Sequence, residues 1–280
     1  MKYFLYNPLC GSGESEKMAK DYSAKLTEEV KMLDMTEILS YEDLIRGLDK
    51  TDEICVFGGD GTLNKLVNAI ADIEIEHPLY YFPSGTGNDF ANDICKEKPN
   101  EPILINQYIK NLPTVTVNGK RYRFINGVGF GIDGYCCEVG DRLKAEGKKP
   151  NYTSIAIKGL LFGFSSRNAE VVVDGERMEF KKVWIAPTMF GRYYGGGMMP
   201  TPCQDRCAEE SSVSLMVFHG SGKLRTLMIF PSIFKGEHVK KKKHVSVFSG
   251  KNITVRFDRP TPLQIDGETV LGVTEYTVEI

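Results

Sequence analysis

Apolar and polar residues alternate along this chain in two different ways, and the pattern changes near residue 114. Before that point, short apolar runs are separated by segments in which an apolar residue recurs every three or four positions. This combination is typical of strands that alternate with helices, and it predicts a parallel sheet covered by helices. We expect strands over KYFLYN, EICVF and PLYYFP, and helices over residues 14–31, Tyr41 to Leu48 and Leu63 to Ala71.

From Thr114 onward, short β-type runs are joined by Asn-Gly or Asp-Gly pairs, as in TVTV-NG-KRYRFI, AEVVV-DG-ERMEF and PLQI-DG-ETVLG. Such pairs favour the tight turns of β-hairpins, so this part is predicted to be mostly antiparallel. Helical periodicity interrupts it over Tyr135 to Ala145 and over Tyr152 to Phe164. The predicted fold is therefore an α/β domain with a parallel sheet over residues 1–115, followed by a mostly antiparallel β-sandwich over residues 116–280.

Composition narrows the class of protein. The chain has 280 residues, of which 41% are hydrophobic, and its formal net charge of −2 disfavours a nucleic-acid-binding protein. The first residues hold too few apolar positions for a signal peptide, and no run reaches the roughly 18 apolar residues of a membrane span. The seven cysteines are an odd number and are scattered, which is typical of reduced thiols. We expect a cytoplasmic protein.

Glycine-rich turns follow three of the predicted strands of the first domain. They are YNPLCGSG, Tyr6 to Gly13; GGDG, Gly58 to Gly61; and FPSGTGNDFAND, Phe82 to Asp93. Glycines let the backbone approach a ligand closely, and the N–H groups of a following helix favour anions. Because the carboxyl ends of parallel strands meet at one edge, the three turns are predicted to converge on a phosphate site. The alternative is that they are tight strand-to-helix turns that bind no ligand.

An aspartate, Asp60, lies inside the second glycine turn. A carboxylate beside bare phosphate is repelled, but a bound cation or a proton in transfer reverses that preference. The turn therefore indicates a Mg²⁺-nucleotide site, although neither the G-x-x-x-x-G-K-[ST] pattern nor G-x-G-x-x-G is present. The structural alternative for Asp60 is an N-cap of the helix that contains Leu63.

Taken in order, these motifs resemble the catalytic domain of the diacylglycerol kinase, sphingosine kinase and bacterial lipid kinase family. The likeness extends over essentially the whole chain, because INGVGFGIDG, YYGGGMMPTP and QIDGE resemble later motifs of that family. It implies an ATP- and Mg²⁺-dependent kinase that transfers the γ-phosphate to a hydroxyl of a diacylglycerol-like lipid, as in phospholipid biosynthesis.

The resemblance also implies roles for individual residues. The catalytic base would be Asp266 or Glu268 of QIDGE, and Asp60 would act at the Mg²⁺-phosphate end or in proton transfer. The same Asp-Gly pair is also an ordinary hairpin turn. The residues that would bind or organise the ATP phosphates are Asn7, Gly11, Ser12, Gly13, Gly58, Gly59, Asp60, Gly61, Thr62, Asn64, Thr86, Asn88 and Asp89.

Two positions depart from the family pattern. Lys65 stands where an acidic residue usually follows the asparagine of the glycine turn. The segment EESSVS, residues 209–214, replaces an Asp-rich segment that surrounds a structural metal in the bacterial members. Glu210 and the carbonyls of Cys207 and Ser212 are the candidate ligands that would remain.

A kinase without a membrane anchor must still reach a lipid, so we expect transient, peripheral binding at the inner face of the membrane. HVKKKKH, residues 238–244, offers four lysines to anionic lipid, or is simply a solvated loop. GLLFGF, residues 159–164, would line the substrate cleft, insert at the interface, or belong to the core.

Two alternatives to a lipid kinase stay open. NAD kinase shares the G-G-D-G turn and a two-domain plan. A catalytically weak nucleotide- or lipid-binding regulator would explain Lys65 and EESSVS.

Overall fold

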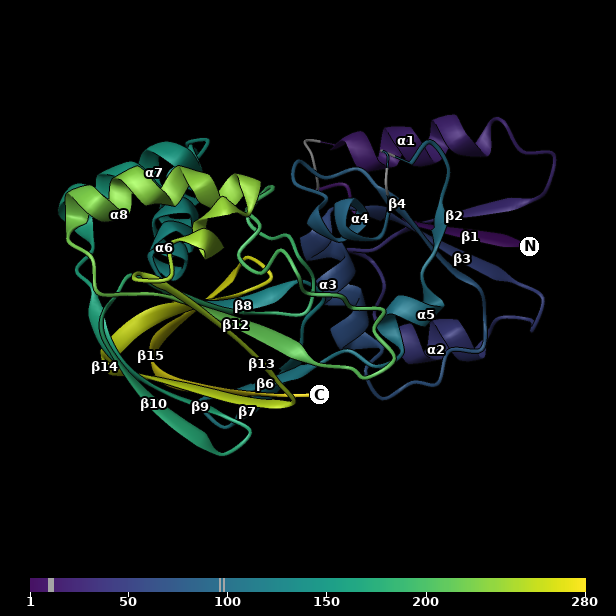
Figure 1. The fold of residues 1–280 in the computed structure, drawn as a ribbon. Coiled ribbons are helices and arrows are strands. Elements are labelled where there is room, and N and C mark those ends of the chain that lie inside the picture. Colours follow the sequence, from purple (N-terminus) through teal and green to yellow (C-terminus); the bar gives the residue numbers. More distant parts are fainter. Residues whose placement is uncertain (10–12, 96, 98) are drawn as a thin grey trace. The chain divides into compact units, whose positions relative to one another are not determined.

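A computed structural model describes residues 1–9, 13–95, 97 and 99–280. The chain forms two compact units, Met1–Leu112 and Pro113–Ile280 (Figure 1). The first unit contains a mostly parallel sheet with helices, and the second contains an antiparallel β-sandwich. The predicted fold class is therefore confirmed.

The sheet of the first unit has the strand order β2-β1-β3-β4-β5. Pairing is parallel from β2 to β4, and only the short edge strand β5 runs antiparallel to its neighbour. The central strand is buried almost throughout, as expected of a sheet covered on both faces. The strands are β1 (Lys2–Tyr6), β2 (Val30–Asp34), β3 (Glu53–Gly58), β4 (Leu79–Pro83) and β5 (Ile103–Leu104).

Helices α1 and α2 lie on opposite sides of this sheet (Figure 1). Beneath α1, the rings of Phe4, Phe57 and Phe82 pack with Tyr22 of that helix, with Phe57 and Phe82 stacked at 5.2 Å between centroids. This aromatic core holds α1 on the strands that precede the glycine turns. The helices are α1 (Glu14–Ser23), α2 (Tyr41–Arg46), α3 (Asp60–Ala69), α4 (Asp89–Ile94) and α5 (Asn106–Ile109).

The helix predicted over residues 14–31 was wrong in its second half. Helix α1 ends at Ser23, and residues from Val30 onward form β2, which pairs in parallel with β1. Leu26 and Val30 pack against the aromatic core, and their spacing of four residues also suits a helical stripe. Pairing with β1 satisfies the backbone of β2, and this tertiary contact overrides the local pattern.

The second unit is built around one antiparallel sheet with the path β13-β12-β11-β8-β14-β15-β6-β7, and β9 pairs with both β14 and β10. The three Asn-Gly and Asp-Gly pairs form the predicted hairpins β6–β7, β9–β10 and β14–β15. The strands are β6 (Thr114–Val117), β7 (Lys120–Arg123), β8 (Gly127–Gly131), β9 (Arg167–Val173), β10 (Glu176–Val183), β11 (Ile185–Met189), β12 (Val213–Phe218), β13 (Val245–Gly250), β14 (Asn252–Ile265) and β15 (Glu268–Glu279).

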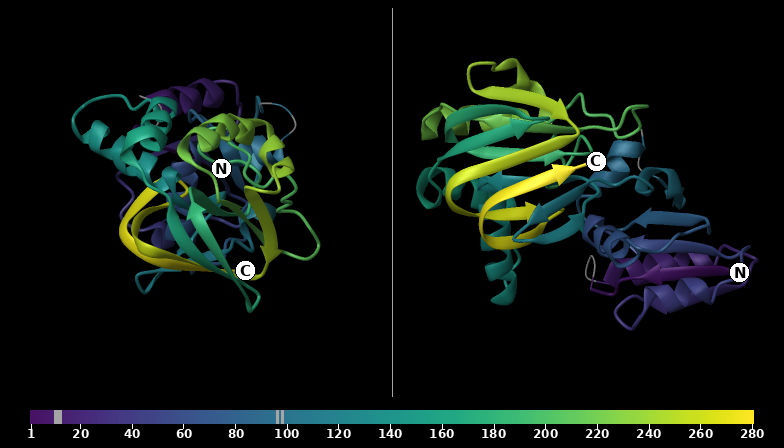
Figure 2. Two further views of the ribbon diagram at one scale, coloured as in Figure 1. Left: turned by 60° about the vertical axis from the view of Figure 1, so that its left-hand side comes forward. Right: turned by 90° about the horizontal axis from the view of Figure 1, so that it is seen from below.

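Strand β14 joins the two layers of the sandwich. Its first half pairs with β9 through residues 253–257, and its second half pairs with β8 through residues 263–265. Register shifts between Arg256 and Leu263 allow the long strand to bend. Both views in Figure 2 show the resulting curvature of the yellow β14–β15 hairpin.

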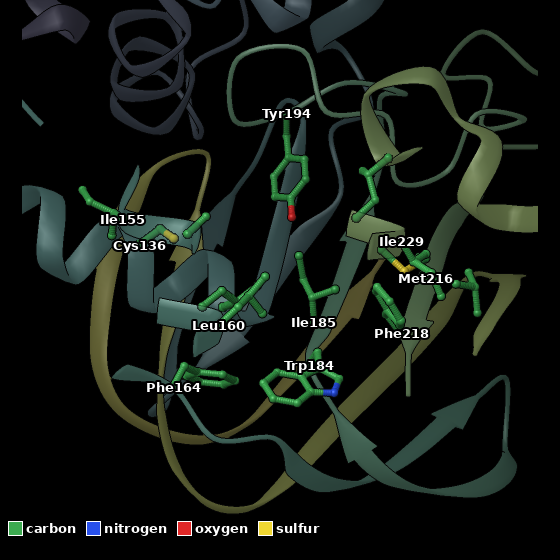
Figure 3. Close-up of a cluster of buried hydrophobic side chains, with 14 of the residues drawn as sticks. Cys136, Ile155, Leu160, Phe164, Trp184, Ile185, Tyr194, Met216, Phe218 and Ile229 are labelled. Carbon is green, nitrogen blue, oxygen red and sulfur yellow. The ribbon is translucent and has the colours of Figure 1, made fainter. Parts of the chain in front are cut away.

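Helices cover one face of β11 and β12 in the second unit. Trp184, Ile185 and Phe218 pack there against Leu160 and Ile229 (Figure 3). The helical elements are α6 (Ile132–Ala145), α7 (Tyr152–Lys158), the π-helical turn η2 (Gly159–Gly163), α8 (Lys223–Ile229), and the 3-10 turns η3 (Phe230–Lys235) and η4 (Glu237–Lys240). No helix in the described ranges is long and apolar enough to cross a membrane.

Candidate functional site

The glycine turns of the first unit are joined by hydrogen bonds at the carboxyl ends of their strands. Asn7, after β1, donates its side-chain Nδ2 to Thr62 Oγ1 at 3.1 Å. Ser84, after β4, donates its backbone N–H to the Gly58 carbonyl at 2.9 Å. The predicted convergence of the turns on one sheet edge is therefore present in the described residues. Cys10, Gly11 and Ser12 lie outside them.

Asp60 connects the second turn to the third. One carboxylate oxygen accepts the backbone N–H of Asp89 at 3.0 Å, and the other accepts that of Phe90 at 2.8 Å. These N–H groups begin α4, where no carbonyl within the helix can reach them. Asn88 stands at the cap position in a left-handed conformation, and its own side chain bonds Gly85 instead. Asp60 thus caps α4 from outside that helix, while Gly59 stands at the N-cap position of α3, the helix in which Asp60 lies.

The glycines of this site differ in the space around them. A Cβ on Gly85 would lie 2.6 Å from the Gly59 Cα, so the two turns touch through their backbones. A Cβ on Gly58 would lie 2.5 Å from the Thr62 Cβ. By contrast, a Cβ on Gly61 would meet no atom of the described residues beyond its own helical turn within 4 Å. The first turn of α3 therefore borders open space, where its N–H groups favour an anion.

The other predicted phosphate-site residues differ in burial and in their contacts. Asp89 is buried at the start of α4, next to Asp60, and Thr86 is exposed on the third turn. Asn64 is buried on α3, where its Oδ1 and carbonyl accept hydrogen bonds from the Asn68 side chain. Gly13 adopts a left-handed conformation as the N-cap of α1.

In the second unit, Asp266 holds the segment that leads into β8. Its carboxylate accepts the backbone N–H groups of Ile125, Asn126 and Gly127 at 2.6, 2.9 and 2.9 Å. Asp266 has a φ of 46°, as the tight turn to Gly267 requires. These hydrogen bonds occupy three of the roughly four acceptor positions of a carboxylate. Glu268 begins β15 two residues later, and its side chain is exposed.

Arg206 binds oxygen atoms of the same segment. It was not identified from the sequence. Its guanidinium donates to the Ile125 carbonyl at 3.0 Å and to Asn126 Oδ1 at 3.3 Å. It also lies over the Phe190 ring, 5.5 Å from the centroid. Asp266 and Arg206 together fix the backbone of the INGVGFG motif. An arginine in a turn-rich stretch carries no local signal of that contact.

The second unit also contains a buried carboxylate, Asp133. Its Oδ2 accepts the Tyr194 hydroxyl at 3.3 Å, and a Cβ on Gly129 would lie 1.7 Å from that oxygen. Tyr194 is the buried tyrosine of the YYGGGMMP motif, and its hydroxyl points into the cluster in Figure 3. Burial raises the pKa of Asp133 to about 6, against hydrogen bonds from Gly134 and Tyr194 that lower it. Asp133 belongs to the quoted GFGIDG motif, yet the sequence did not single it out.

The proposed metal ligands lie in the loop before β12. The Ser212 carbonyl accepts the Gln204 side-chain N–H at 2.8 Å, and the Cys207 N–H donates to Asp205. Glu210 is exposed. No group of three or more His, Cys, Asp or Glu side chains in the described part of the chain is placed to hold a metal ion. A metal bound by Glu210 and the two carbonyls stays a prediction.

Comparison with known families covers almost all of the chain. Residues 2–116 match the model described as "Diacylglycerol kinase catalytic domain". Residues 126–280, more than half of the chain, match the model described as "YegS C-terminal NAD kinase beta sandwich-like domain". The first match contains the joined glycine turns, and the second contains Asp133, Arg206 and Asp266.

Individual relatives agree with these matches. The chain is 24% identical to the "Putative lipid kinase YtlR" of Bacillus subtilis over 81% of its length and 77% of the relative. It is 27% identical to a "Diacylglycerol kinase" of Mycobacterium tuberculosis over 84% of its length and 78% of the relative. A solved structure titled as a "putative diacylglycerol kinase" from Bacillus anthracis shares the fold, with a TM-score of 0.68, 19% identity, and 99% and 91% coverage. The chain belongs to the lipid kinase family that contains the diacylglycerol kinase catalytic domain.

Proposed function

We propose that this protein transfers the γ-phosphate of ATP, together with Mg²⁺, to a hydroxyl of a diacylglycerol-like lipid. Residues 1–115 would bind the nucleotide, and residues 116–280 would bind the lipid and supply the base. The observation that best supports this proposal is the pair of hydrogen bonds from the Asp89 and Phe90 N–H groups to Asp60. They hold two glycine turns together beside the open first turn of α3. Phosphoryl transfer needs this kind of fixed backbone donor more than it needs covalent chemistry from the protein.

The phosphates would contact the turns that contain Asn7, Gly59, Gly61, Thr62 and Thr86. Support comes from the link between Asn7 and Thr62. It also comes from the open space at a Cβ position on Gly61, where no described residue beyond its own helical turn places an atom within 4 Å. A side chain at Gly61 would occupy the space where a phosphate oxygen could approach the N–H groups of α3.

Asp60 and Asp89 are the residues proposed to hold Mg²⁺. The two lie at the starts of neighbouring helices, joined by the hydrogen bond from the Asp89 N–H to Asp60. One or two carboxylates suit Mg²⁺, which in nucleotide sites keeps waters and phosphate oxygens as its other ligands. When bound, the ion would neutralise charge on the phosphates.

The QIDGE turn is proposed to provide the base, and the hydrogen bonds favour Glu268 over Asp266 for that role. Asp266 would position the turn, because its oxygens already accept three backbone N–H groups. The exposed Glu268 carboxylate would accept the proton of the lipid hydroxyl. The hydroxyl oxygen would attack the γ-phosphorus while the bond from that phosphorus to the bridging oxygen breaks and ADP leaves.

A lipid substrate places the reaction at a membrane surface, so we propose peripheral and transient binding at the cytoplasmic face. The phosphorylated product would enter phospholipid synthesis.

The test is incubation of the purified protein with γ-labelled ATP and a total lipid extract, followed by chromatography and mass spectrometry of labelled products. Labelled phosphatidic acid or a related phospholipid, lost on chelation of Mg²⁺, is expected. Parallel incubation with NAD tests the alternative acceptor. ATP binding by calorimetry without labelled product under any lipid condition would instead indicate a regulator without turnover.

A further inference from the structure

Large apolar side chains protrude from two neighbouring elements of the second unit. Phe162 of η2 is 85% exposed, and on α8 Leu224 and Met228 are 73% and 67% exposed. Leu224 and Met228 are four residues apart, so they share one face of the helix. Ile157 at the end of α7 is also exposed. We call Ile157, Phe162, Leu224 and Met228 the apolar face.

The two elements are bound to each other. Lys223, at the start of α8, donates its Nζ to the Leu161 carbonyl in η2 at 2.8 Å. Leu160 of η2 and Ile229 of α8 are buried in the same core cluster (Figure 3). The turn η2 follows α7 directly in the chain. The residues of the apolar face therefore belong to neighbouring elements that share a packed core.

Within the GLLFGF stretch, Phe162 is exposed although the large apolar residues two positions away on each side are not. Its neighbours Leu160 and Phe164 are buried, so this stretch already supplies the core from other positions. An exposed aromatic side chain forgoes the stabilisation that burial gives, and a surface that exposes several large apolar groups together is typical of an interaction site.

The segments that carry the apolar face contain basic residues but no acidic ones. Residues 147–168 and 211–236, which include α7, η2 and α8, contain no Asp or Glu. They contain the basic residues Lys148, Lys149, Lys158, Arg167, Lys223, Arg225 and Lys235. The chain as a whole has a net charge of −2, so this concentration of positive charge is local. Lys148 pairs with Glu146 at 2.7 Å, so the net positive charge comes from the other basic residues. Apolar side chains on segments whose own charges are all positive are complementary to a bilayer that contains anionic lipids.

We propose that the apolar face docks this protein on an anionic phospholipid bilayer, with Phe162, Leu224 and Met228 inserted among the lipids and Lys158 and Arg225 at the headgroups. The inference deepens the proposed lipid kinase function, on which it rests, by assigning the membrane-binding surface. It differs from docking through the lysine run at residues 240–243, where Lys240 lies 3.8 Å from Glu237 and the flanking His238 and His244 are buried.

The experiment measures co-sedimentation with vesicles of equimolar phosphatidylcholine and phosphatidylglycerol, and with phosphatidylcholine alone. The combined variant Phe162→Ser, Leu224→Ser, Met228→Ser is expected to bind the anionic vesicles at least 100-fold more weakly, since each inserted side chain contributes about tenfold. Lys158→Gln with Arg225→Gln should weaken binding to the anionic vesicles only, and should reduce its salt dependence.

Leu39→Ser is the matched control, because Leu39 is fully exposed in the first unit, and it should bind as the wild type does. Thermal unfolding checks that every variant is folded. Unchanged binding by the triple variant would overturn the proposal. So would loss of binding only in Lys241→Gln, Lys242→Gln, Lys243→Gln. A wild-type dimer in the absence of vesicles that the triple variant dissociates would instead identify the surface as a contact between copies, and would also overturn it.

A soluble short-chain diacylglycerol separates this inference from the proposed function. The triple variant should phosphorylate that monomeric substrate at the wild-type rate and lose activity only on vesicles. If the wild type phosphorylates no lipid in either form, the kinase proposal fails, while the sedimentation result still decides the docking surface.

Discussion

The carboxylate of Asp60 accepts the backbone N–H of Phe90 at 2.8 Å, across 30 residues of sequence. This bond, with its partner from Asp89, fastens the third glycine turn to the second. A negative charge inside a predicted phosphate site thus has a structural use, since it caps a helix that has no side-chain cap of its own.

Replacement of Asp60 tests this connection. Asp60→Ala leaves two N–H groups at the start of α4 without their acceptor, so we expect a loss of about 1–3 kcal/mol in the free energy of unfolding. Urea denaturation gives the value, and Asp72→Ala is the control because Asp72 is an exposed carboxylate of the same unit. Equal stability of the two variants would contradict the assignment.

Alanine substitutions at two glycines should have opposite effects on stability. Gly85→Ala forces a Cβ to within 2.6 Å of the Gly59 Cα, so a loss of about 1–3 kcal/mol is expected. The Cβ of Gly61→Ala meets no atom within 4 Å from the part of the chain that the structure describes outside its own helical turn. Because Gly61 lies in the first turn of α3, this variant should unfold at an equal or higher temperature than the wild type. It should nevertheless bind ATP more weakly in calorimetry. Wild-type ATP affinity in Gly61→Ala would argue against phosphate binding at this turn.

Substitutions at the two carboxylates of the QIDGE turn should change different quantities. Glu268 should affect kcat, and Asp266 should affect the free energy of unfolding. Glu268→Gln is expected to lower kcat by about 100-fold or more without a change in the melting temperature, as loss of a base does. Asp266→Asn places an N–H₂ group among three backbone N–H donors, so it should lower the free energy of unfolding by about 1–3 kcal/mol. Full kcat in Glu268→Gln, with a collapsed kcat in a normally stable Asp266→Asn, would reverse the roles.

Asp133 should make the stability of the protein depend on pH. Its pKa is raised from 3.8 to about 6 by burial, so as pH rises the unfolded chain loses this proton first. The stabilisation from the protonated folded form is complete below pH 3.8 and is lost as pH rises through about 6, a change of about 3 kcal/mol.

Urea denaturation of the wild type and Asp133→Asn across this pH range measures the effect. The difference between their free energies of unfolding should change by about that amount, with the wild type losing stability relative to the variant as pH rises. All other titrating groups are shared, so they cancel in the difference. A difference that does not vary with pH would show that Asp133 titrates as it does in water.

Local patterns in the sequence were sufficient for the fold class and for most elements. The hairpins at Asn118, Asp174 and Asp266 follow from turn chemistry, because each of these residues adopts a positive φ before a glycine. The glycine turns followed from the same logic, since a parallel sheet brings the ends of its strands to one edge. The Asp60 cap on α4 did not follow, because its partners are nearly thirty residues distant and offer only backbone atoms.

The sequence by itself determined where strands, turns and the carboxylates of the motifs stand, because periodicity and glycine chemistry act over a few residues. Only the tertiary structure decided what those carboxylates contact. Strand β2 formed where a helix was predicted, Asp266 became an anchor for residues 125–127, and Phe162 stayed exposed while Leu160 and Phe164 were buried. Each outcome depends on the burial and backbone pairing of distant segments, and no local pattern encodes that pairing.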